Sequence, residues 1–140
     1  TAAISLTKFA AVMESLLTPR SSKWSRIVSV DKTLNNNRQA REWFESVNDL
    51  LFAYRNSPRA NFSSQKQEGY LQLGAFGTDP LFIDRPDGWR GFRYKSCSLA
   101  NIYMRENHQG IIDTVYRRIP DMTARQAFQK WGDKIPDEIK

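Results

Sequence analysis

The chain has 140 residues and a mass of 16.2 kDa, which is the size of one ordinary domain. Its hydrophobic fraction of 40% and charged fraction of 26% are those of a globular protein, so a wholly disordered chain is excluded. No apolar run approaches the roughly 18 residues of a membrane span, and no secretory leader opens the chain, so we expect an intracellular protein. A net charge of +6 favours an anionic partner.

The first predicted element is an amphipathic helix over residues 4–17. Its apolar residues recur at helical spacing, at Leu6, Phe9, Val12, Met13, Leu16 and Leu17. Pro19 ends this helix, because the residue before a proline avoids the α region. A short basic loop follows. We therefore expect an N-terminal segment over residues 1–34 and an α+β body over residues 35–140, within a single domain overall.

Two further helices are predicted in the next part of the chain. The run of asparagines at 35–37 can cap a helix over residues 38–56, whose apolar stripe is Trp43, Val47, Leu50, Leu51 and Tyr54. After Ser57 and Pro58, a third helix carries a stripe of Phe62, Lys66, Gly69, Tyr70 and Leu73. We expect Gly74 to cap this helix in a left-handed conformation. The short link predicts that the two helices pack as an antiparallel pair.

Beyond Gly77 the spacing of apolar residues changes from the helical period to the two-residue period of β-strands. Apolar or alternating runs lie at 81–83, 91–96, 102–104 and 111–119, with turn residues at 85–88 and 107–110. These predict an antiparallel β-meander of about four strands. Thr123 and Gln126 form a capping-box pattern before a short C-terminal helix that ends at Gly132, with a buried stripe of Ala127, Phe128 and Trp131. The predicted fold class is therefore α+β.

We find no pattern of residues that predicts catalysis, a cofactor or a metal. His108 is the only histidine, and the neighbouring carboxylates Asp79, Asp84 and Asp87 lack the series of ligands of a calcium loop. The glycine-rich segment 74–78 lacks the Gly-Lys-Ser/Thr ending of a phosphate-binding loop. We expect instead that the structural junctions are Pro19, Gly74, Gly77 and Thr78, and that Cys97 is a small buried residue.

Basic residues beside aromatic ones provide the candidate contacts to nucleic acid, through phosphate neutralisation and base stacking. The candidates are Lys23, Trp24, Arg26, Arg117 and Arg118. A different interpretation is that Trp24 anchors its turn to the core while the basic side chains face water. The pattern favours this second interpretation.

Several segments together resemble the portal, or head-to-tail connector, proteins of tailed bacteriophages with short tails. The resemblance extends from Phe9 to Gly132. It is carried by the helix end at 15–19 followed by Trp24, the junction at 70–78, and the segments 101–107, 110–118 and 122–127. The order and spacing of these irregular junctions are specific, although each segment alone is not.

The resemblance implies a non-catalytic structural protein that forms a ring, usually of twelve copies, at one vertex of the capsid. Double-stranded DNA would be packaged and ejected through the ring, and the other partners would be terminase, capsid and tail adaptor proteins. The location would be the virion, and the host cytoplasm during assembly. The alternative is a nucleic-acid-binding module of a DNA-processing protein.

The family's long channel-lining stem helices and its terminase-facing clip are not recognisable in this sequence. We therefore expect a fragment of a longer chain that corresponds to the outer, wing-like body. By itself such a fragment should be a monomer or a weak oligomer. Its former interface residues should then be exposed, and we expect these to be Phe9, Met13 and Leu16 of the first helix.

Overall fold

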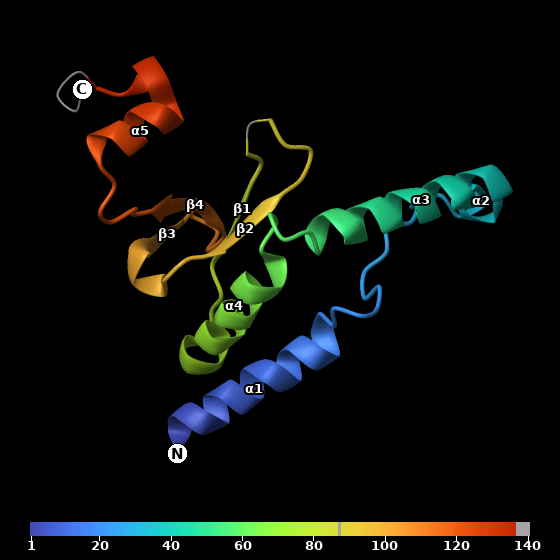
Figure 1. Ribbon diagram of the computed structural model, residues 1–140, viewed down its shortest axis with the longest axis horizontal. Coiled ribbons are helices and arrows are strands. Elements are labelled where there is room, and N and C mark those ends of the chain that lie inside the picture. Colours follow the sequence, from blue (N-terminus) through green and yellow to red (C-terminus); the bar gives the residue numbers. More distant parts are fainter. Residues whose placement is uncertain (87, 137–140) are drawn as a thin grey trace. The chain divides into compact units, whose positions relative to one another are not determined.

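The computed structural model describes residues 1–86 and 88–136 (Figure 1). Asp87, which the sequence places in a turn, and residues 137–140 lie outside the described residues. The chain divides into two compact units, Thr1–Leu99 and Ala100–Lys140. Residues 1–34 therefore belong to the same unit as the helices that follow them. None of the helices in the described ranges is long and apolar enough to cross a membrane.

The first unit contains four α-helices, α1 (Ala2–Leu17), α2 (Lys32–Asn36), α3 (Arg38–Arg55) and α4 (Phe62–Phe76). The predicted helices over 4–17 and 38–56 are confirmed, and Asn37 caps α3 by accepting hydrogen bonds from two backbone amides. Helix α2 was not predicted. It forms because Asp31 caps it, accepting from the hydroxyl and the amide of Thr33 at 2.7 and 2.8 Å. Both hydrogen bonds lower the pKa of Asp31, and the bond from the Thr33 hydroxyl has the larger effect.

The capping role predicted for Gly74 is wrong, and Gly77 has it. Helix α4 continues to Phe76, and Gly77 takes a left-handed φ of 75° while its amide donates to the Leu73 carbonyl at 2.8 Å. Gly74 lies inside the helix, where a Cβ atom would meet Leu6 Cδ1 at 2.6 Å and Phe9 Cδ1 at 2.8 Å. The absence of a side chain at Gly74 therefore allows α1 to approach α4 closely.

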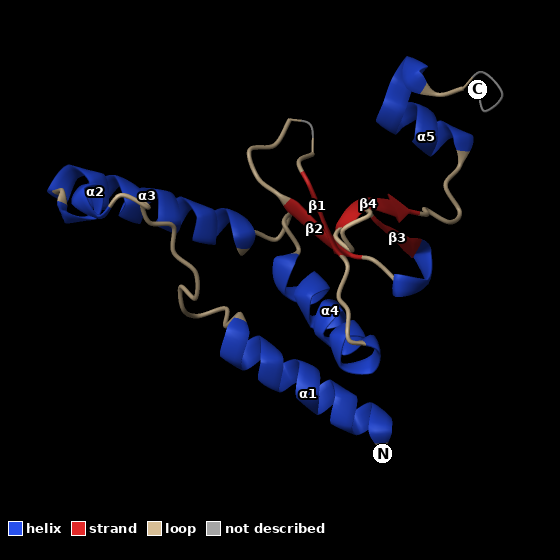
Figure 2. Ribbon diagram, turned by 180° about the vertical axis from the view of Figure 1, so that it is seen from behind, coloured by secondary structure: helices blue, strands red, loops and turns tan. Residues whose placement is uncertain are grey.

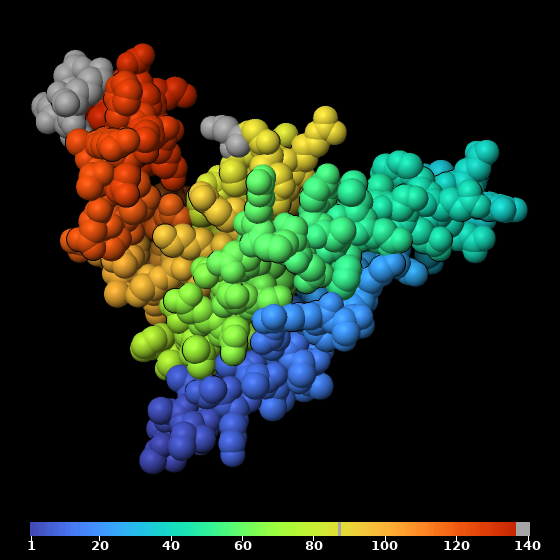
Figure 3. All heavy atoms as spheres, in the orientation of Figure 1, coloured from blue at the N-terminus to red at the C-terminus, as the bar shows by residue number. Residues whose placement is uncertain are grey.

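An antiparallel helix pair is present, but α4 pairs with α1 and not with α3 as the short link had predicted (Figures 1 and 2). The link from Ser57 to Asn61 turns the chain: the Ala60 amide donates to the Ser57 carbonyl at 3.0 Å, and Asn61 has a φ of 54°. Inside the pair, the hydroxyl groups of Thr18 and Tyr70 form a buried hydrogen bond of 3.0 Å. In the space-filling view α1 (blue) lies along α4 (yellow-green), and in this view no other described part of the first unit covers the side of α1 that faces away from α4 (Figure 3).

Four antiparallel strands are confirmed, but they form two separate two-stranded sheets and not one meander. In the first unit β1 (Leu81–Asp84) pairs with β2 (Arg93–Ser96), with Leu81 opposite Ser96. The outer edge of β2 is occupied: the Tyr94 amide donates to the Ala60 carbonyl at 2.9 Å, and the Ser96 amide donates to Gln65 Oε1 at 2.7 Å. Since helix α4 and its preceding link take these groups, no further strand can pair there.

The second unit contains β3 (Ile102–Glu106), β4 (Ile112–Arg117) and α5 (Ala124–Trp131), followed by a 3₁₀ turn at Gly132–Lys134. The turn predicted at 107–110 is confirmed, with Asn107 Oδ1 accepting from the Gln109 amide at 2.8 Å. The capping box is confirmed as well. The buried stripe predicted for α5 is wrong except at Ala127, because Phe128 and Trp131 are exposed.

We predict that Tyr70→Phe lowers the free energy of unfolding by about 1 to 3 kcal/mol, because Thr18 would keep a buried hydroxyl without a partner. Tyr54→Phe is the matched control, since Tyr54 is half-buried and no hydrogen bond of its hydroxyl is recorded among the described residues. Urea unfolding followed by circular dichroism measures both variants. Equal losses in the two variants would contradict a stabilising role for the Thr18–Tyr70 bond.

Candidate functional site

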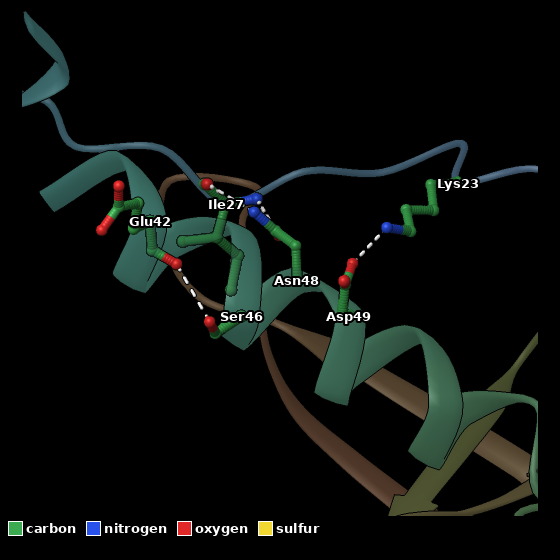
Figure 4. Close-up of polar contacts among 6 residues, drawn as sticks. All are labelled: Lys23, Ile27, Glu42, Ser46, Asn48 and Asp49. Carbon is green, nitrogen blue, oxygen red and sulfur yellow. Dashed lines mark hydrogen bonds and ion pairs between the residues drawn. The ribbon is translucent and has the colours of Figure 1, made fainter. Parts of the chain in front are cut away.

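The basic loop between α1 and α2 is attached to α3 at its centre (Figure 4). Asn48 is a buried polar residue of α3 and makes two hydrogen bonds to Ile27 of the loop. Asn48 Oδ1 accepts from the Ile27 amide at 2.7 Å, and Asn48 Nδ2 donates to the Ile27 carbonyl at 3.1 Å. One side chain thus satisfies both backbone groups of an otherwise irregular segment. The loop therefore has a defined path along the helix.

Lys23 and Trp24 are held by contacts inside the first unit. Lys23 forms an ion pair with Asp49 of α3 (Figure 4). The Trp24 ring stacks on Phe62 with centroids 5.9 Å apart, and the Arg55 guanidinium lies 4.5 Å from the Trp24 ring centre. Arg55 also donates to the Ser25 hydroxyl at 2.7 Å. These contacts support the anchoring interpretation of Trp24, because the ring is already packed against α3 and α4 residues.

The other candidate contacts are distributed over both units. Arg26 is exposed and borders two shallow depressions between the loop and α3, of about 250 and 140 Å³. Among the described ion pairs, none involves Arg26. Arg117 ends β4 and is half-buried, while Arg118 is exposed and its amide donates to the Asn101 carbonyl at 2.8 Å. The structure thus gathers Lys23, Trp24 and Arg26 in the first unit and places the arginine pair in the second.

A depression at the start of α4 was not predicted from the sequence. It has a volume of about 270 Å³, and its lining includes Arg20, Arg55 and the first residues of α4. Both arginines are engaged: Arg20 pairs with Glu14 at 3.1 Å, and Arg55 lies over the Trp24 ring. Only the fold brings Arg20 and Arg55 together, and no local spacing in the sequence predicts it.

The junction between α4 and β1 is closed by a buried ion pair. Lys66 Nζ donates to Asp79 Oδ2 at 2.6 Å, and the Asp79 side chain is only 7% exposed. The carboxylate lies directly on Gly69, where a Cβ atom would come within 2.3 to 2.5 Å of it. Asp79 Oδ1 is the one buried side-chain polar atom without a hydrogen bond in the described part of the chain. The junction predicted as structural thus depends on Gly69 and Asp79 as well as on Gly77.

Over residues 1–86 and 88–136, no group of three histidine, cysteine or acidic side chains is placed to hold a metal ion. His108 lies exposed in the turn between β3 and β4, and Cys97 is buried and is not part of a disulfide. The candidate site consists of the basic loop, the aromatic anchor and the closed helix-to-strand junction described above.

We predict that Gly69→Ala lowers the free energy of unfolding by about 2 kcal/mol, because the new methyl group overlaps the Asp79 carboxylate. In an Asp79→Ala background the same change should cost little, since the space is then empty. A double-mutant cycle by chemical denaturation measures the difference. An equal cost of Gly69→Ala in both backgrounds would show that the carboxylate does not constrain this glycine.

Comparison with protein-family models matches residues 1–140 to the family described as bacteriophage head to tail connecting protein. A search of curated proteins finds no match to the chain. The family match includes every element described above, from α1 to α5, and agrees with the resemblance carried by the irregular junctions of the sequence. The chain therefore belongs to the family of bacteriophage head to tail connecting proteins.

Proposed function

We propose that this chain is a subunit, or the outer body of a subunit, of a non-catalytic ring through which phage DNA is packaged and ejected. The observation that carries the proposal is the family match over residues 1–140, which gives the chain a structural role between phage head and tail, and thus a place in the virion. The proposed ring contains about twelve copies at the portal vertex of the capsid. Its partners are terminase during assembly in the host cytoplasm, the capsid, and tail adaptors afterwards.

Three properties of the chain support this proposal. The net charge of +6 suits a protein close to DNA. The candidate site consists of packing and ion-pair contacts, which stabilise a scaffold. The core is small for a protein of this length: no large side chain is fully buried among the described residues, which is typical of a subunit completed by its neighbours.

Removal of the gene from the encoding phage tests the proposal. A ring used for packaging must be present before DNA enters, so we predict capsids without DNA, counted by electron microscopy and density gradients. A protein that only joins a filled head to its tail would leave DNA-filled heads without tails. That second outcome would contradict the packaging ring and keep the connecting role.

A second candidate function is direct binding of nucleic acid, and Arg26 is the observation that favours it. Arg26 is exposed, lies on a loop held in place by Asn48, and takes part in none of the described ion pairs. Lys23 is a weaker candidate because Asp49 neutralises it. The arginines of the second unit, Arg117 and Arg118, remain proposed contacts.

We predict that Arg26→Ala weakens binding to duplex DNA and reduces the slope of log affinity against log salt by roughly 0.9, the effect of one lost phosphate contact. Arg38→Ala is the matched control, because Arg38 is exposed and paired with Glu42 at 2.8 Å. Fluorescence anisotropy at several salt concentrations measures both. Equal slopes in the two variants, or no binding by the unmodified chain at low salt, would remove the second candidate function.

A further inference from the structure

The outward side of α1 forms an apolar ridge with a single charge. Helix residues four apart lie next to each other along one ridge, and here these are Ile4, Lys8, Val12 and Leu16. All four are exposed, and Leu16 is 72% exposed. The opposite side, with Leu6 and Ala10, faces α4. Of the two residues predicted to be exposed beside Leu16, Phe9 is exposed and Met13 is half-buried.

The β3–β4 hairpin of the second unit carries an apolar face as well. Residues opposite each other in an antiparallel pair project to the same face, and the side alternates along each strand, so the pairs Ile102–Arg117 and Met104–Val115 share one face. Glu106, two residues beyond Met104, lies opposite Ile112 past a shift in the register. Met104, Glu106, Ile112 and Val115 are exposed, with Val115 58% exposed, whereas Ile102 and Arg117 are half-buried. A two-stranded hairpin is only marginally stable alone. Among the described elements of the second unit, no other element packs on the hairpin as extensively as β3 and β4 pack on each other. Within the second unit, this face is therefore available to a partner.

The exposed area indicates how much surface is left to cover. The chain exposes 10936 Å². Two separate compact bodies of the sizes of its two units would together expose about 8,800 Å², which leaves an excess of roughly 2,000 Å². A standard interface covers about 800 Å² of each partner, and a ring subunit makes two such contacts. The excess thus matches what two neighbouring copies would cover.

One exposed charge on each face has the opposite sign to the other. Lys8 is the one charged residue of the α1 ridge, and Glu106 is the exposed charge among the register-paired residues of the hairpin face, whose basic residue Arg117 is half-buried at the other end of the strands. Neither Lys8 nor Glu106 takes part in an ion pair among the described residues. A helix ridge and a sheet face also bury each other in the ordinary way of layered packing. The two faces therefore fit each other in polarity and charge.

We infer that the α1 ridge of one copy packs on the β3–β4 hairpin face of a second copy, with Lys8 opposite Glu106. This rests on the ring proposed above. Because the two faces are different, each copy offers one of each, and the contact can repeat from copy to copy around a closed ring.

A charge-swap experiment on the whole chain tests the contact. Lys8→Glu alone or Glu106→Lys alone places like charges opposite each other, so we expect self-association to weaken about tenfold or more in sedimentation velocity from micromolar to millimolar concentration. The chain with both changes should regain association. So should an equal mixture of the two single variants, because each copy then meets its complement in the other. Lys32→Glu and Glu68→Lys, both at exposed positions, are the matched controls and should leave association unchanged.

Three outcomes would overturn the inference. Rescue in the double variant but not in the mixture would place the contact within one chain. Association of the unmodified chain that neither single variant weakens would exclude this surface while leaving the ring intact. If the unmodified chain stays monomeric at every concentration, a second copy is excluded as the partner of these two faces. The gene-removal experiment would then still test the proposed ring independently.

Discussion

Helix α4 is the element on which the first unit depends, because its side chains supply the long-range polar contacts that its neighbours need. On one side Tyr70 meets Thr18 at the end of α1 in a buried hydrogen bond. On another side of the helix, Gln65 Oε1 accepts a hydrogen bond from the Ser96 amide and so closes the edge of β2. Lys66 binds the buried Asp79 carboxylate at the approach to β1. Because no large side chain is fully buried among the described residues, these specific bonds define which elements pack on α4. Hydrophobic burial alone would leave the choice of neighbours open.

The local elements could be predicted from the sequence, since local chemistry determines them. Pro19 after α1, Asn37 before α3 and Thr123 before α5 each act through the backbone of their own turn. The long-range pairing could not be predicted. Asn61 turns α4 away from α3 toward α1, and the Gln65 side chain takes the strand edge that a continuous meander would have used. Gly74 was misassigned because a helix-breaking residue in sequence can also be a point of close approach between helices.

In the candidate site, too, the features set by local sequence could be predicted, and the contacts that depend on the fold could not. The sequence predicted a basic loop and a helix-to-strand junction as candidate sites, and the preferred interpretation of Trp24 as an anchor agrees with its stacking on Phe62. It missed Arg55 and Asn48, which hold the loop, because their roles depend on the path of the loop along α3. Family membership then gives this scaffold its place between phage head and tail. The exposed ridge of α1 and the uncovered hairpin face of the second unit are consistent with a subunit whose folding is completed by assembly.

Copies of this chain are proposed to complete one another around the head-to-tail junction. A cryo-electron microscopy reconstruction of that junction in the encoding phage, refined with the symmetry of the junction, tests this proposal most directly. We predict a ring in which α1 of each copy lies on the β3–β4 hairpin of its neighbour, with DNA or an open channel on the axis. A junction with a single copy of the chain, or with α1 and the hairpin facing solvent in every copy, would contradict it.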